Sequence, residues 1–109
     1  MDKEVLIGEQ SYIHPKAQIK GQVVIGSGCT ILEDAVIEQS IIWHKVKIGR
    51  GAKVRNSIVA NNCCLNADSI MEESVLGDNV TVGSGCKLEP YSKIWPETTV
   101  EPETKLSLK

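Results

Sequence analysis

Aromatic residues are nearly absent from this sequence: they make up 4% of its 109 residues, and phenylalanine does not occur. Most compact domains rely on a few large rings to fill their core. Hydrophobic residues nevertheless account for 41% of the chain. The interior must therefore be built mainly from isoleucine, valine and leucine, of which the first two strongly favour β-strands.

Other absences exclude whole classes of partner. The net charge is only −2 and both signs are mixed along the chain, whereas a nucleic-acid surface needs clustered lysine and arginine. No apolar run is long enough to span a bilayer, and the N-terminus lacks the layout of a signal peptide. We therefore expect a cytoplasmic protein with no nucleic-acid partner and no membrane partner.

The four cysteines lack the paired CxxC spacing that is typical of zinc sites and redox motifs. They are Cys29, Cys63, Cys64 and Cys86. We expect small buried thiols rather than metal ligands or disulfide partners. The sequence thus indicates neither a bound metal nor a cofactor.

A repeat of six residues runs through almost the whole chain. Eighteen aliphatic positions follow one another at this interval, except at three places where the interval shortens to five. These positions are Ile7, Ile13, Ile19, Ile25, Ile31, Ile37, Ile42, Ile48, Val54, Val59, Leu65, Met71, Leu76, Val82, Leu88, Ile94, Val100 and Leu106. The pattern predicts short strands that each point one aliphatic side chain inward.

The three shortened units show how the strands are arranged. They lie at 37–41, 54–58 and 71–75, which is a spacing of seventeen residues, or three hexads less one. Three hexads per coil would place every shortening on the same side of a three-sided prism. We therefore predict an all-β fold, a single-domain parallel β-helix of six triangular coils of 17–18 residues, in which stacking buries the core. The coils are 7–24, 25–41, 42–58, 59–75, 76–93 and 94–109, with 1–6 as a lead-in and 94–109 as an irregular capping coil.

A second position, four residues after each core aliphatic, holds only small or apolar residues. They are Ser11, Ala17, Val23, Cys29, Ala35, Ile41, Val46, Ala52, Ile58, Cys63, Ser69, Val75, Val80, Cys86, Ser92, Thr98 and Thr104. We expect these side chains to face inward near the corners. The interior is then filled, and any binding site must lie on the outer surface.

One outer row can also be predicted from the register. Five charged residues, each directly after a core aliphatic of the third side, should stack on one another: Lys20, Glu38, Arg55, Glu72 and Glu89. Neighbours of opposite charge can pair, although exposed pairs contribute only about 0–1 kcal/mol each. A solvated face is the favoured interpretation over a binding stripe.

The unit IGSGCT at 25–30 resembles the repeat of the hexapeptide superfamily, whose coils are left-handed. We expect a left-handed β-helix from that resemblance. The segments SIIW at 40–43, SIVA at 57–60 and SVLG at 74–77, with KIWPE at 93–97, make the chain similar to the C-terminal domain of sugar-1-phosphate nucleotidyltransferases. The resemblance is to the mannose-1-phosphate guanylyltransferase and glucose-1-phosphate adenylyltransferase type.

That resemblance implies a domain without a catalytic site of its own. The related enzymes bind nucleotide and sugar phosphate in an N-terminal α/β domain that a glycine-rich stretch opens. Here the glycine clusters at 26–28, 49–51 and 83–85 fall at corners of the repeat, without the strand and helix that a phosphate loop needs. The resemblance therefore implies an assembly or regulatory domain whose partner is a nucleotidyltransferase catalytic domain.

Three alternatives to this interpretation can be compared with the residues present. A hexapeptide acyltransferase, acting as a homotrimer, would use a surface histidine as general base. The two histidines are His14 and His44, and we expect both to be structural residues of a first turn and a corner. A γ-class carbonic anhydrase needs three histidine ligands, which two histidines on different sides do not supply. A pure scaffold is the third alternative, so no catalytic residue is assigned.

Exposed apolar residues would mark a self-association surface. The register places a small set of them at outward positions: Leu32, Val36, Trp43, Ile70 and Trp95. We expect part of this set to mediate a homo-oligomer through one outer face. Scattered apolar residues on a monomer are the alternative.

Overall fold

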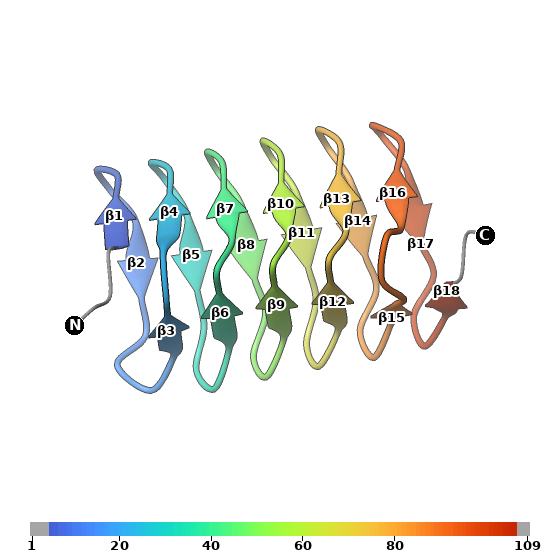
Figure 1. Ribbon diagram of the computed structural model, residues 1–109, viewed down its shortest axis with the longest axis horizontal. Helices are drawn as coiled ribbons and strands as arrows, with labels where there is room; N and C mark the ends of the chain where they lie inside the picture. Colours follow the sequence, from blue (N-terminus) through green and yellow to red (C-terminus); the bar gives the residue numbers. More distant parts are fainter. Residues whose placement is uncertain (1–4, 107–109) are drawn as a thin grey trace.

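The computed structural model describes residues 5–106, which form a prism of six stacked coils measuring 36 × 24 × 20 Å (Figure 1). Each coil contributes one short strand to each of three parallel, six-stranded sheets. Between residues 5 and 106 no helix is long and apolar enough to cross a membrane. The predicted left-handed parallel β-helix is confirmed.

The strands recur in a fixed order around the prism. Sheet A contains β1 (Val5–Ile7), β4 (Val23–Ile25), β7 (Ile41–Ile42), β10 (Ile58–Val59), β13 (Val75–Leu76) and β16 (Lys93–Ile94). Sheet B contains β2 (Tyr12–Ile13), β5 (Thr30–Ile31), β8 (Lys47–Ile48), β11 (Cys64–Leu65), β14 (Thr81–Val82) and β17 (Thr99–Val100). Sheet C contains β3 (Gln18–Lys20), β6 (Val36–Glu38), β9 (Lys53–Arg55), β12 (Ile70–Glu72), β15 (Lys87–Leu88) and β18 (Lys105–Leu106).

The register of the sheets follows the sequence repeat. In sheet A, Ile25 pairs with Ile42, and Ile42 pairs with Val59; the other two sheets align their core aliphatics in the same way. From the second coil to the fifth, the core aliphatics are almost completely buried. The coil length that was predicted from the shortened units is therefore correct.

The corner between sheets C and A corrects one prediction. We expected Ile41, Ile58 and Val75 to face inward, but each is more than a third exposed on the outer face of sheet A. Side chains alternate along a strand, so the inward residue is always two before the next core aliphatic. In a six-residue unit that residue is also four after the previous core position, whereas in a five-residue unit it is only three after. Serines occupy this inward position in the shortened units.

These serines form a buried column that links the coils. The backbone N–H of Ser57 donates to Oγ of Ser40, and the N–H of Ser74 donates to Oγ of Ser57, both at 3.1 Å. Each of the three hydroxyls in turn donates to a carbonyl two residues earlier in its own coil. At the shortened corners, the serine side chains thus provide hydrogen-bond partners for the buried polar groups, which nearly always have such partners in folded proteins.

Replacing Ser57 with alanine should lower the free energy of unfolding by about 1–3 kcal/mol, because the buried N–H of Ser74 loses its acceptor. Ser92→Ala is the matched control. The Ser92 hydroxyl donates to the carbonyl of Glu89, which also accepts from Ser74 Oγ, so we expect a loss below about 1 kcal/mol. Urea denaturation followed by circular dichroism measures both, and equal losses would contradict the column.

The last coil is more regular than expected. We predicted an irregular cap from residue 94, but β16, β17 and β18 pair in register with the fifth coil. At the equivalent corner of earlier coils, a backbone N–H donates to a side chain of the following coil. Pro96 occupies this position in the sixth coil, and it fits because proline has no N–H that needs such an acceptor. Residues 1–4 of the expected lead-in, residues 107–109 of the expected cap and the side chain of Leu106 lie outside the described part.

Candidate functional site

His44 belongs to a row of side chains that cap the corner between sheets A and B. The N–H of Ser27 donates to Nδ1 of His44 at 2.9 Å, and the N–H of His44 donates to Oδ1 of Asn61 at 3.0 Å. One coil further, the N–H of Asn61 donates to Oδ1 of Asp78 at 3.0 Å. Histidine, asparagine and aspartate therefore do the same structural task at equivalent positions.

This contact constrains the chemistry of His44. A nitrogen that accepts a backbone N–H carries no proton of its own, so the neutral ring holds its proton on Nε2. The hydroxyl of Ser27 lies 3.2 Å from the same Nδ1. The Nδ1 lone pair that could serve as a general base is thus already engaged by the backbone of the corner, and Nε2 is a donor.

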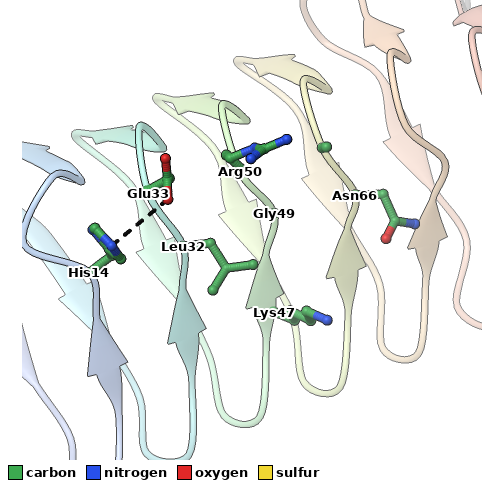
Figure 2. Close-up of a pocket in the computed structure, with 8 residues that line it drawn as sticks. His14, Leu32, Glu33, Lys47, Gly49, Arg50 and Asn66 are labelled. Atoms are coloured by element: carbon green, nitrogen blue, oxygen red, sulfur yellow. Dashed lines mark ion pairs between the residues drawn. The ribbon is translucent and has the colours of Figure 1, made fainter.

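His14 lies in an open depression beside the corner between sheets B and C (Figure 2). Its Nδ1 accepts the N–H of Lys16 at 3.0 Å, and its Nε2 lies 4.0 Å from Oε1 of Glu33. Figure 2 shows His14 and Glu33 pointing toward each other, whereas Lys47 and Arg50 extend away from them. The polar groups spread along the face rather than converge on one point.

The cysteines are free and mostly buried, as expected. Three thiols donate to carbonyl oxygens of the corners: Cys29 to Trp43 at 2.9 Å, Cys63 to Gly77 at 3.0 Å and Cys86 to Glu101 at 2.9 Å. Burial raises the pKa of the Cys63 thiol, so this group stays protonated at neutral pH. Within residues 5–106, no three histidine, cysteine or acidic side chains gather as metal ligands would.

The predicted charged row of sheet C has the expected register, in which Lys20 pairs with Glu38 and Arg55 pairs with Glu72. One contact within it is an ion pair, between Nε of Arg55 and Oε1 of Glu38 at 3.4 Å. Both side chains are more than a third exposed, so water screens the pair and it contributes little.

The outer face of sheet A is apolar, which the predicted register did not indicate. Leu6, Val24, Ile41, Ile58 and Val75 occupy successive rungs of one outward row, and all of them are exposed. The signal was present in the serines at 40, 57 and 74, because alternation places the next residue outward.

The predicted interface set does not share one face. Leu32 lines the depression beside His14, whereas Val36 and Ile70 are half-buried on sheet C. Trp43 and Trp95 directly follow core residues of sheet A and are exposed. These two tryptophans alone of the set extend the apolar face.

The first coil leaves part of the core open at one end of the prism. Ile7 is 50% exposed, and Val5, Ile13 and Ile19 are half-buried. In the sixth coil, by contrast, Ile94 and Val100 are each only 7% exposed. In the described part, β1, β2 and β3 each pair with one neighbouring strand only. The N-terminal end therefore presents apolar side chains together with strand edges.

The solved structures that resemble this chain include proteins described as acetyltransferases. A Bacillus cereus protein that is assigned as an acetyltransferase has a TM-score of 0.63 and 14% identity, over 92% of this chain and 76% of its own. A GDP-perosamine N-acetyltransferase from Caulobacter crescentus has a TM-score of 0.45 and 12% identity, over 93% of this chain and 54% of its own. At such identity the first likeness shows the fold alone.

Comparison of the sequence with curated proteins finds no match. A family model does match: the one described as the GMPPB C-terminal domain covers residues 1–107. This match confirms the resemblance to the C-terminal domain of sugar-1-phosphate nucleotidyltransferases that was drawn from the repeat segments. The chain therefore belongs to the GMPPB C-terminal domain family.

Proposed function

We propose that this chain is a non-catalytic assembly or regulatory domain of a sugar-phosphate nucleotidyltransferase-like protein. The family match over residues 1–107 carries the proposal. The chemistry of the surface supports it, because His44 uses its basic nitrogen in a corner contact and the polar groups around His14 do not converge.

The N-terminal end of the prism is where a catalytic domain would dock. The half-exposed Ile7 lies among the partly buried Val5, Ile13 and Ile19, so this end offers an apolar patch. The edges of β1, β2 and β3 offer backbone donors and acceptors beside that patch. A segment that covers this end would bury the patch and satisfy the edges together.

Binding to a catalytic domain tests the proposal. We expect the chain to bind the nucleotidyltransferase domain of a mannose-1-phosphate guanylyltransferase from the same organism, measured by isothermal titration calorimetry. Ile7→Gln should weaken that binding at least about tenfold, which corresponds to about 1.4 kcal/mol. Ile58→Glu, on the outer face of sheet A, is the control and should bind as the unchanged chain does. Absence of binding would overturn the proposed function, whereas equal binding by Ile7→Gln would overturn the docking at the N-terminal end of the prism.

A homotrimeric acyltransferase is the alternative, and it predicts a different result. It predicts that the chain alone transfers the acetyl group of acetyl-CoA to an amine or hydroxyl acceptor with release of the coenzyme A thiol, and that His44→Asn abolishes this activity. Asparagine can still accept the N–H of Ser27 as Asn61 accepts that of His44, so the fold should persist. If the unchanged chain were active and His44→Asn were inactive, the acyltransferase function would be favoured over the proposed assembly role.

A further inference from the structure

The outer face of sheet A carries an unbroken row of aliphatic side chains. Leu6 pairs with Val24, and the row continues through Ile41, Ile58 and Val75 before Lys93 ends it. At about 4.8 Å per coil, the five aliphatics extend over about 19 Å. Leu6 is 68% exposed and the other four are 38–40% exposed, so water covers the row in the isolated chain.

Both tryptophans of the sequence lie beside this row. Each follows an inward core residue of sheet A, so alternation directs its ring to the same outer face. Trp43 is 47% exposed and Trp95 is 82% exposed. Trp95 lines one apolar depression together with Val75, Gly77 and Lys93, so it lies beside the C-terminal end of the row.

The size of this surface matches a protein interface. Given typical areas for aromatic and aliphatic side chains, the five aliphatics and two tryptophans expose on the order of 700 Å², close to the ~800 Å² that each partner buries in a standard interface. Apolar patches on monomers seldom exceed a few hundred Å². This patch is therefore large enough for a stable dimer.

The order of residues along the face is complementary to itself. Consider a twofold axis that lies in the interface, runs along the strands and passes between the third and fourth coils. It places Ile41 opposite Ile58 and Val24 opposite Val75. The next row then places Trp43 opposite Ala60. At the ends of the same row, Trp95 lies opposite Gly8.

We propose that sheet A binds sheet A of a second copy in this antiparallel orientation. Each bulky ring then faces a small residue, and the aliphatic rows pack against each other. Lys93 lies at the rim, where its charge can remain in water while its stem covers Leu6. An interface of this kind is isologous and closed, so it stops at two copies. The inference concerns a different face from the proposed docking of a catalytic domain, and it does not depend on that docking.

Light scattering over a range of concentrations tests the dimer. The expected mass is twice the 11.9 kDa of one chain at high concentration, falling toward one chain on dilution. Ile58→Glu should raise the dissociation constant at least a hundredfold. Ile70→Glu is the matched control: it makes the same change at the equivalent outward position of sheet C, between Lys53 and Lys87, and should leave the dimer intact.

Tryptophan fluorescence gives a second readout, because both rings lie on the proposed interface. Emission should shift to longer wavelength on dilution of the unchanged chain and of Ile70→Glu. Ile58→Glu should show the long-wavelength emission at every concentration, with a circular dichroism spectrum that shows the fold is kept. A monomer or trimer mass at high concentration, or a dimer that persists in folded Ile58→Glu, would overturn the proposal. Loss of catalytic-domain binding in Ile7→Gln with the dimer unchanged would show that the two surfaces act separately.

Discussion

Replacing Gly49 with alanine is expected to lower the free energy of unfolding by about 2–3 kcal/mol. The added Cβ would lie 2.7 Å from the backbone N of Ala67 and 2.8 Å from the carbonyl carbon of Asn66. Both atoms belong to the next coil, which the hydrogen bond from the N–H of Gly49 to the carbonyl of Leu65 holds at 2.6 Å. The clash is therefore with backbone and cannot be relieved by a side-chain rotation.

Gly28→Ala is the control for Gly49→Ala. It distinguishes the effect of the backbone contact between coils from the effect of replacing a glycine. Gly28 has a φ of +71°, but its Cβ would meet only Cγ of Lys45 at 3.5 Å. We expect a loss of about 1 kcal/mol from the left-handed backbone alone. Thermal and urea denaturation, followed by circular dichroism, compare the two variants. If Gly28→Ala proved as destabilising as Gly49→Ala, the contact between coils would not be the cause.

Leu65→Ala, in the middle of the prism, should lower the free energy of unfolding by about 2–5 kcal/mol. Leu65 is fully buried on β11, between Ile48 of the coil before and Val82 of the coil after. The ladders on both sides hold the backbone in place, so the cavity cannot collapse. Because every coil is stabilised by its neighbours, the loss weakens two coil interfaces at once.

Leu32→Ala is the control for this second prediction. It removes the same atoms from a half-buried side chain that lines the open depression beside His14. The loss should stay below about 1 kcal/mol, because solvent can fill the space. Urea denaturation at a protein concentration below that of dimerisation measures both variants. Similar losses would contradict the placement of Leu65 in the core.

The repeat made the fold predictable because the inward aliphatic is under the strongest physical constraint. In a prism this narrow, the side chains of Ile48 and Leu65 can face only the core. The regular spacing of such residues in the sequence therefore determines how neighbouring strands pair. The seventeen-residue spacing of the shortened units then defined the three sides. The ion pair between Arg55 and Glu38 followed from that register without further information.

The outer faces were less predictable, because nothing in the repeat specifies them. A position four residues after each core aliphatic predicts that Ile41, Ile58 and Val75 lie inside. Alternation operates backward from the next core residue, and Ser40, Ser57 and Ser74 take the inward position instead. Because of this one-residue difference, the predicted register did not show the apolar face of sheet A. The predicted interface residues were scattered, and only Trp43 and Trp95 among them lie on that face. The capping task of His44 depends on side-chain contacts between coils, which the sequence pattern does not encode.

The buried serine column also determines how such a molecule can change in length. The coils 25–41, 42–58 and 59–75 each contain seventeen residues and each end in the same serine corner. Tandem duplication of one such segment would add a complete coil, continue all three ladders and extend the column without a break. The prism can thus grow during evolution only in discrete steps, each of about 4.8 Å. A duplication of this kind would give sheet A seven strands and move its centre from the space between two coils onto a coil. The length of the prism therefore determines which side chains meet across a symmetric contact.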